Sequence, residues 1–346
     1  MKLGDYMKSI YGYTEEMLKE YLKSNNQKPF RAAQLIEWLY RHKISSFDEI
    51  TNMKKDFILQ LKNDFTIDEL ECVTHQKSSD GTQKFLFKLA DGNLIETVLM
   101  CHDYGYSVCV TTQVGCNMGC QFCASGMKKK LRNLEAFEIV LQILTVSKLA
   151  DVRVSHVVVM GIGEPFDNYD NVIRFLKIIN NPLGLEIGAR HITVSTCGLV
   201  DKIYEYSDFD LQVNLAISLH APNNEIRNQI MNINKAYPIE KLIDAIKYYI
   251  DKTNRRVTIE YILLQGINDS KQNANELANL LHGLNVYVNL IPYNEVIEKP
   301  YKRSKPEDMV SFFDVLKKRR INVQLRREQG GDIDAACGQL RSKHIK

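Results

Sequence analysis

Short runs rich in β-branched residues alternate with helical stretches from Ser107 onward, and this alternation is the feature that most constrains the fold. It is typical of a parallel sheet built from βα units. Six βα units are too few to close an eight-stranded barrel, so we predict the α/β class with an open (βα)6 partial TIM barrel. The predicted strands are residues 107–114, 156–160, 191–196, 211–220, 256–264 and 286–293, with a further strand-like run at 322–327 after a helix near 306–319.

The part of the chain before the barrel has two different patterns. The first is helical and basic, and in it Ser46 and Glu49 have the spacing of a capping box. The second alternates as strands do, with Asp80-Gly81 and Asp91-Gly92 as hairpin turn signals. We predict a small N-terminal helical domain at residues 1–66 and a β-hairpin linker that forms a meander at 67–101. The barrel is predicted at 102–300 and a C-terminal extension at 301–346.

Three cysteines, Cys116, Cys120 and Cys123, lie within eight residues, and no fourth cysteine follows nearby. A 4Fe-4S cluster normally takes four thiolates, so three would leave one iron open to a substrate, as a catalytic zinc keeps one open position. A structural zinc site needs four ligands, and the nearest histidines, His102 and His156, lie outside zinc-finger spacings. A chain of 346 residues does not need a disulfide framework. The triplet therefore predicts an iron-sulfur site with an open position.

Polar and glycine residues follow successive predicted strands. Because chemistry gathers at the carboxyl ends of barrel strands, we expect these residues to face one site. Each also has a structural interpretation, as a glycine turn, a cap or a satisfied core histidine. A nicotinamide-binding fingerprint is disfavoured, because Pro165 and Phe166 interrupt its glycine pattern. The candidates are Gly163, Glu164, Ser195, Ser218, His220 and Asn294.

Five cysteines lie outside the triplet. Free cysteine usually behaves as a small buried hydrophobe, so Cys72, Cys101 and Cys197 are predicted to pack in the core. Cys109 alternates within a strand and, taken alone, would be placed there too. Cys337 differs, because glycines and alanines around it predict a loop that is not part of the core.

Charge and hydropathy limit the possible partners. A net charge of +3 is too small to indicate nucleic-acid binding by itself. The basic run of Lys128, Lys129, Lys130 and Arg132 comes directly after the triplet and indicates phosphate contact, or else a solvated helix start. No stretch approaches the roughly 18 apolar residues that span a bilayer. We therefore expect no membrane partner and a cytoplasmic location.

Several segments resemble the RlmN family of dual-specificity RNA methyltransferases, which are radical S-adenosylmethionine (SAM) enzymes. The resemblance runs nearly from end to end. The sister Cfr family shares the triplet and the Cys337 segment but tends to carry alanine in place of Pro165, so RlmN is favoured. The chain departs from the usual pattern at Asn232, where proline is usual, and at Cys197, which varies. The segments are KPFRAAQLIEWLY, QVGCNMGCQFCASG, GIGEPFDN, AISLHAPNNEIR, RVTIEYILLQGIND, NLIPYN and RREQGGDIDAACGQLR.

The resemblance implies the formation of 2-methyladenosine in 23S rRNA and tRNA, with a 4Fe-4S cluster and SAM as cofactors. It implies that one SAM methylates Cys337 and that a second SAM is cleaved at the cluster to a radical that activates this methyl group. Glu96 would remove the ring proton, and Cys109 would release Cys337 as a disulfide. The implied cluster ligands are Cys116, Cys120 and Cys123, and the implied SAM contacts are Gly163, Glu164, Ser195, Ser218, Leu219, His220 and Asn294.

The resemblance also implies partners. They are 23S rRNA, tRNA and an electron donor such as flavodoxin or ferredoxin, with residues 1–66 as an RNA-binding accessory domain. We expect a monomer, because no coiled-coil or repeat pattern is present. Two alternatives stay open. One is a Cfr-like enzyme that acts on carbon 8 of the adenine in 23S rRNA, and the other is a metal-carrying RNA-binding module without catalysis.

Overall fold

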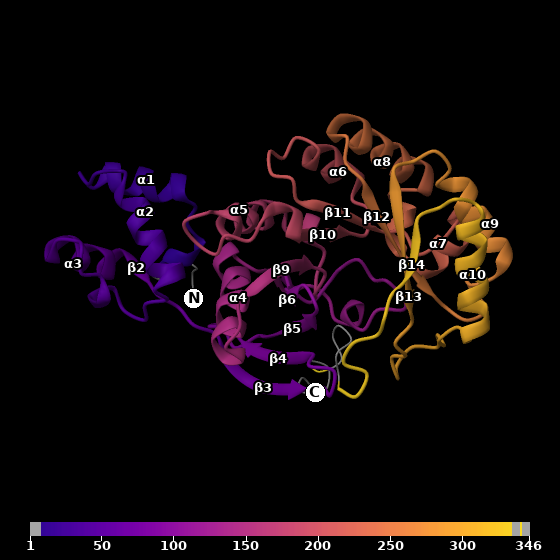
Figure 1. Ribbon diagram of the computed structural model, residues 1–346, viewed down its shortest axis with the longest axis horizontal. Helices are drawn as coiled ribbons and strands as arrows, with labels where there is room; N and C mark the ends of the chain where they lie inside the picture. Colours follow the sequence, from indigo (N-terminus) through magenta and orange to yellow (C-terminus); the bar gives the residue numbers. More distant parts are fainter. Residues whose placement is uncertain (1–7, 334–339, 341–346) are drawn as a thin grey trace.

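The structure, a computed structural model, describes residues 8–333 and residue 340. Its centre is a ten-stranded sheet in the order β14-β13-β12-β11-β10-β9-β6-β5-β4-β3 (Figure 1). Among the described residues the two end strands do not pair with each other, so the sheet stays open, and the predicted partial barrel is confirmed. The parallel strands are β6 (Gly105–Cys109), β9 (Val154–Val159), β10 (Ile192–Thr196), β11 (Asn214–Ser218), β12 (Val257–Leu263), β13 (Val286–Pro292) and β14 (Val323–Leu325).

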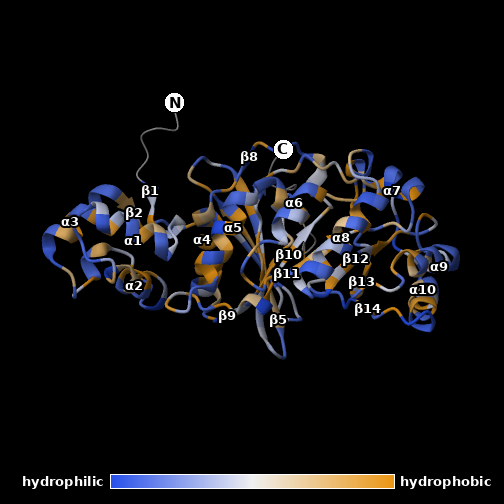
Figure 2. Cartoon of the chain, turned by 90° about the horizontal axis from the view of Figure 1, so that it is seen from above, coloured by the Kyte–Doolittle hydropathy of each residue, from blue (hydrophilic) through white to orange (hydrophobic). Residues whose placement is uncertain are grey.

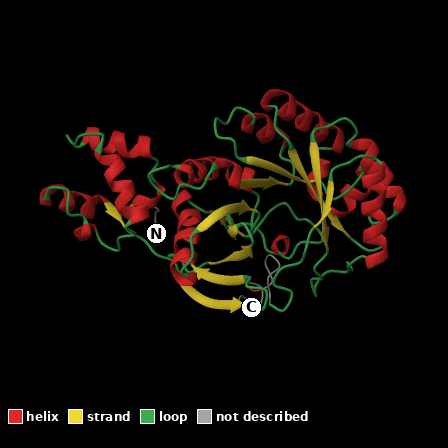
Figure 3. Ribbon diagram, in the orientation of Figure 1, coloured by secondary structure: helices red, strands yellow, loops and turns green. Residues whose placement is uncertain are grey.

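Helices lie along the outer side of the curved sheet (Figure 3). The longest begin and end where the sequence provides caps: Glu135 and Glu138 form a capping box, and Asp151 closes the same helix in the left-handed conformation, at φ 50°. That helix, α4, is strongly hydrophobic, whereas much of α3 and α7 is hydrophilic (Figure 2). The helices that follow the strands are α4 (Ala136–Ala150), α5 (Tyr169–Asn180), α6 (Val200–Tyr206), α7 (Asn224–Ile230), α8 (Ile239–Thr253), α9 (Lys271–Leu280) and α10 (Pro306–Lys318).

Alternation along each strand separates an outer face from an inner face. In β12, Tyr261 points outward and packs against Phe312 of α10, with 5.2 Å between ring centroids. Its neighbour Glu260 points inward and accepts a hydrogen bond of 2.9 Å from the Asn289 side chain of β13. The barrel interior is therefore partly polar, which short apolar runs in the sequence do not reveal.

Three antiparallel strands continue this sheet from β6: β5 (Leu94–His102), β4 (Gln83–Lys88) and β3 (Glu71–Lys77). Gly81 and Gly92 adopt φ of +87° and +83° in the turns that connect them. Such angles suit glycine, so the turns predicted from the Asp-Gly pairs are confirmed.

The N-terminal elements form a small helical unit beside α4 and α5 (Figure 1). Arg41 donates a hydrogen bond of 2.7 Å to the Pro182 carbonyl, which follows α5. Ser46 and Glu49 form the predicted capping box, although it starts a 3-10 helix of one turn. The elements are β1 (Lys8–Ser9), η1 (Ile10–Gly12), α1 (Glu15–Ser24), α2 (Arg31–Ile36), the π-helix η2 (Glu37–Arg41), η3 (Phe47–Glu49), α3 (Lys55–Asp64) and β2 (Phe65–Thr66).

The strand predicted at 107–114 is shorter in the structure. It ends at Cys109, and the chain then leaves the sheet before β7 (Gln113–Val114) pairs with β8 (Arg132–Asn133). The Val110 carbonyl accepts a hydrogen bond from Gly161, and Thr112 donates one to the Ile162 carbonyl, at 3.0 Å each. These bonds to the loop after β9 replace strand pairing. Short 3-10 helices occur at η4 (Ser125–Met127), η5 (Pro165–Asn168), η6 (Ala189–His191) and η7 (Asn232–Lys235).

In the described part of the chain, no helix has both the length and the apolar character that crossing a membrane requires.

Candidate active site

The hairpin β7–β8 carries the loop that contains the cysteine triplet. Cys116 donates a backbone hydrogen bond of 3.1 Å to the Lys128 carbonyl, and Leu131 donates one of 2.7 Å to Val114. The two sides of the loop approach so closely at Gly115 that an added Cβ would collide with the Lys129 carbonyl. The glycine-rich loop therefore folds tightly around its three thiols.

The three thiols are half-buried, and burial raises the pKa of Cys116 to about 12 in the protein alone. The Ser125 hydroxyl in the same loop is buried and has no hydrogen-bond partner among the described residues. No group of three His, Cys, Asp or Glu side chains in the described chain could hold a single metal ion. Soft thiolates on three different irons suit a cubane, whose ligands do not converge on one ion. The residues present fit a 4Fe-4S cluster better than a single zinc ion.

The triplet loop packs into a small apolar cluster that is separate from the main core. The Phe122 ring lies edge-on to His220 with 5.1 Å between ring centroids, and its carbonyl accepts a hydrogen bond of 3.1 Å from the Tyr293 hydroxyl. Gln121 donates a backbone hydrogen bond of 2.9 Å to Ile230 of α7. Contacts from several strand ends thus fix the loop. The cluster consists of Phe122, Ala124, Cys197, Ala221, Ile230, Met231, Leu264, Tyr293 and Val296.

A buried polar network joins the ends of β9, β10 and β11. Arg227 of α7 is fully buried and donates hydrogen bonds to the carbonyls of Cys197, at 2.7 Å, and Leu219, at 3.2 Å. Glu164 accepts from the backbone N–H of Cys197 at 2.8 Å and of Phe166 at 3.0 Å, and burial raises the pKa of this carboxyl. Sequence reasoning missed Arg227, although it ends the quoted segment AISLHAPNNEIR.

The predicted strand-end residues lie at the carboxyl ends of β9, β10, β11 and β13, as expected. The hydroxyls of Ser195 and Ser218 are 3.4 Å apart. Gly163 has φ +111°, and a Cβ there would lie 2.7 Å from the Cβ of Gln113. Asn294 is exposed and lines the cavity described below.

His220 and Leu219 are more engaged within the chain than a ligand-binding role would suggest. The Nδ1 of His220 accepts a hydrogen bond of 3.1 Å from the Ile262 N–H, and burial lowers the pKa of the ring to about 3. The N–H of Leu219 donates a hydrogen bond of 3.1 Å to the backbone carbonyl of Glu260, and the Leu219 carbonyl accepts one from Arg227. His220 is therefore a neutral hydrogen-bond acceptor that binds the backbone of Ile262.

A cavity of about 280 Å³ opens at this end of the barrel. Three predicted site residues line it: Cys109, Cys123 and Asn294. Its wall is otherwise mostly apolar, with basic groups from the segment after β14. The other lining residues are Thr82, Val98, Met100, Phe122, Ala124, Val158, Met160, Ile262, Ile291, Pro292, Tyr293, Val296, Arg326, Arg327, Glu328 and Gln329.

Strand register brings Glu96 and Cys109 together on the inner face. Cys109 of β6 lies opposite Val98 of β5, so Glu96 and Cys109 are diagonal neighbours. The Glu96 carboxylate is 4% exposed and lies 3.0 Å from the ammonium of Lys84, which is fully buried. Read alone, the sequence would make Glu96 a surface carboxylate, and it gives no sign of Lys84.

Cys337 lies outside the described residues, but the segment before it is attached to the turn between β3 and β4. Asp332 accepts hydrogen bonds from the Ser78 hydroxyl and from the Ser79 N–H, the latter at 3.0 Å. Burial would raise the pKa of Asp80, but hydrogen bonds from Gly330 and Thr82 lower it to about 2. Two bonded aspartates therefore fix the approach of this segment to the inner face.

The other cysteines divide by position. Cys197 is buried as predicted, and Cys72 is half-buried. The prediction for Cys101 is wrong, because its side chain is exposed near the end of β5. Cys101 is the residue before the last one of β5, and a thiol so near a strand end can remain in solvent.

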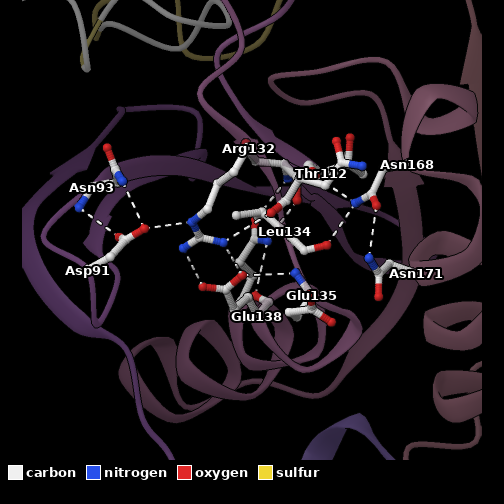
Figure 4. Close-up of polar contacts among 12 residues, drawn as sticks. Asp91, Asn93, Thr112, Arg132, Leu134, Glu135, Glu138, Asn168 and Asn171 are labelled. Atoms are coloured by element: carbon white, nitrogen blue, oxygen red, sulfur yellow. Dashed lines mark hydrogen bonds and ion pairs between the residues drawn. The ribbon is translucent and has the colours of Figure 1, made fainter. Parts of the chain in front are cut away.

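Acidic residues surround part of the basic run after the triplet. Arg132 donates to Asp91 at 2.6 Å and to both oxygens of Glu138 at 2.7 and 2.8 Å (Figure 4). Lys130 lies 2.6 Å from Asp167. Residues 132–133 form β8 and not a helix start. The expected phosphate contact is therefore best tested at Lys129, whose side chain is exposed.

We expect Lys129→Gln to weaken RNA binding and to reduce the slope of log affinity against log salt by about 0.7–0.9, the contribution of one phosphate contact. Binding titrations over a range of salt concentrations measure this slope. Lys241→Gln on the exposed side of α8 is the matched control and should leave the slope unchanged. Equal slopes for wild type and Lys129→Gln would assign the contact elsewhere.

Comparisons with known proteins find similar sequences over nearly the whole chain. The profile of the radical SAM superfamily matches residues 110–281, and that of the ribosomal RNA large subunit methyltransferase N-terminal domain matches residues 8–67. The chain is 60% identical over 346 residues to a probable dual-specificity RNA methyltransferase RlmN of Listeria welshimeri, covering 98% of this chain and 94% of the relative. A protein of the same description from Acholeplasma laidlawii is 58% identical over 336 residues, covering 97% and 99% of the two chains.

A solved structure has the same fold. It is a radical SAM methyltransferase from Sphaerobacter thermophilus, which superposes with a TM-score of 0.90 at 41% sequence identity. The match covers 96% of this chain and 98% of the other. The fold thus extends over both the barrel and the N-terminal unit.

Proposed function

This chain belongs to the RlmN family of radical SAM RNA methyltransferases, which use a 4Fe-4S cluster and SAM, and we propose that it forms 2-methyladenosine in 23S rRNA and tRNA. The observation that carries the proposal is the inner-face arrangement around one cavity. A carboxylate and a thiol, Glu96 and Cys109, are diagonal neighbours there, and Cys109 shares the cavity with Cys123 of the triplet. A resolving thiol and a cluster ligand in one cavity wall, with a base diagonal to that thiol on the inner face, suit the proposed reaction.

When bound, the cluster and SAM would supply the radical that activates a methyl group on Cys337. Cys116, Cys120 and Cys123 would hold the cluster. The SAM site would be held or shaped by Gly163, Glu164, Ser195, Ser218, Leu219, His220 and Asn294. Of these, Glu164 and Leu219 would act through the buried polar network around Arg227, and His220 through its hydrogen bond with Ile262.

The described residues support the later steps. Glu96 would accept the proton of the adenine ring, because its carboxylate lies on the inner face, diagonal to Cys109 of the cavity wall. Cys109 would attack the Cys337 sulfur and form a transient disulfide. The bond between that sulfur and the methylene carbon would break, with its electron pair passing to the carbon, which would take up a proton and leave as the methyl group of the RNA. The apolar wall of Val98, Met100 and Val158 would exclude water from the reacting carbon.

We propose both RNAs as substrates because the relatives above are described as dual-specificity RNA methyltransferases. Residues 1–66 would assist RNA binding, and a small electron-transfer protein such as flavodoxin or ferredoxin would reduce the cluster. Ribosomal and transfer RNA substrates place the activity in the cytoplasm.

Anaerobic reconstitution with SAM and RNA, followed by nucleoside analysis, tests the proposal. We expect 2-methyladenosine in both RNAs. Methylation at carbon 8 without carbon 2 would instead support a Cfr-like enzyme. An intact cluster without cleavage of SAM would support a non-catalytic RNA-binding module.

A further inference from the structure

The Lys84–Glu96 pair differs from every other ion pair between described residues. Its two side chains are 0% and 4% exposed, whereas each other pair has at least one partner that is more than 20% exposed. Removing two charges from water costs several kcal/mol per ion, and an apolar pair of the same volume often gives equal or greater stability. Stability alone therefore does not explain two charges at this place.

Register explains how the two groups meet. Lys84 of β4 lies opposite Val98, and Glu96 lies opposite Leu86, so the pair is a diagonal one on the inner face. A lysine is long enough to cover a diagonal spacing of about 7–8 Å. Glu96 has its other diagonal neighbour, Cys109, on the opposite side in β6. Glu96 thus has a cation on one neighbouring strand and the proposed resolving thiol on the other.

We propose that Lys84 is the positioning residue of the base: its ammonium, 3.0 Å away, is the counter-ion with which the buried Glu96 carboxylate takes the adenine ring proton. This inference rests on the proposed function. In the step, the ring C–H bond breaks, its electron pair stays with the ring, and the proton forms an O–H bond with Glu96. The neutral acid later releases that proton to water.

Other titratable groups lie on the same inner face or in the cavity wall. From β6 the facing group is Cys109, and from the far end of β5 it is His102. The segment after β14 contributes Arg326, Arg327 and Glu328 to the cavity wall. Lys84 is the charged group that the structure holds at 3.0 Å from the carboxylate.

The test compares Lys84→Met with wild type in single-turnover resolution of the RNA–protein adduct at several pH values. A buried carboxylate without its cation keeps its proton to higher pH, so the variant-to-wild-type rate ratio should be about 0.1 or lower near pH 6.5 and should approach 1 near pH 9. Taking the ratio at each pH removes the titration of other groups. Methylation of Cys337, measured by mass spectrometry, should be unchanged.

Lys88→Met is the matched control, because Lys88 is on the same strand and pairs with Glu71 at the same 3.0 Å, but with both side chains exposed. Its rate ratio should be close to 1 at every pH. A ratio for Lys84→Met that is equally low at all pH values would indicate a purely structural lysine and overturn the inference. So would a ratio of 1 throughout.

Two further measurements keep the inference testable if Lys84→Met does not fold. Lys84→Gln is also neutral and retains a hydrogen-bond donor, and it should show the same pH-dependent ratio. Infrared difference spectra of wild type against Glu96→Gln need no substitution at Lys84, and a protonated carboxyl band near neutral pH would overturn the inference. Absence of any methylated adenosine from the wild type would instead contradict the proposed function.

Discussion

Cys109→Ala is expected to stop the reaction after RNA has become attached to the protein, so that a covalent RNA–protein adduct accumulates. The thiol lines the cavity and is a diagonal neighbour of Glu96, where it can reach a sulfur that carries the substrate. In the proposed reaction a second thiol displaces Cys337, so without Cys109 free product should fall by about a hundredfold or more. Denaturing gels with labelled RNA measure the adduct, and nucleoside analysis measures the product.

Two comparisons isolate this role. Cys337→Ala should give neither product nor adduct, because no methyl group is carried by the protein. Cys101→Ala removes an exposed thiol from the neighbouring strand β5 and should behave as wild type. Normal yields of free methylated RNA from Cys109→Ala would remove this thiol from the mechanism.

The barrel could be predicted because its signal is local. Each strand from β9 to β13 is a short β-branched run, and each begins and ends within three residues of its prediction. The strand predicted at 107–114 is the exception. Val110, Thr111 and Thr112 continue the β-branched pattern, but hydrogen bonds with Gly161 and Ile162 remove them from the strand. Partners fifty residues away decide this break, and a local pattern does not contain them.

Prediction of the site had a similar limit. The triplet and the strand-end residues could be found because their spacing or their place after a strand is visible in the chain. Lys84 and Arg227 could not be found, since a charged residue reads as a surface residue until its neighbours are known. The strand β4 is buried on both faces, so its sequence QKFLFK gives no alternation that would assign Lys84 to the inner face.

Cys123→Ala is expected to have the largest effect of all, with loss of the cluster and of every activity that depends on it. Only two thiolates would remain, and two cannot hold a cubane that already has one open position. Iron and sulfide should fall to background in the anaerobically purified protein, and production of 5'-deoxyadenosine from SAM should fall by about a thousandfold or more.

The matched control for that variant is Cys197→Ala. Cys197 lies in the same apolar cluster beneath the loop, but its thiol is outside the triplet, and its backbone groups already bond to Glu164 and Arg227. Its truncation should lower the free energy of unfolding by about 1 kcal/mol, with iron content unchanged. If Cys123→Ala keeps a full cluster, a ligand other than these three thiols must complete it, and the open iron position on which the proposed chemistry depends would be lost.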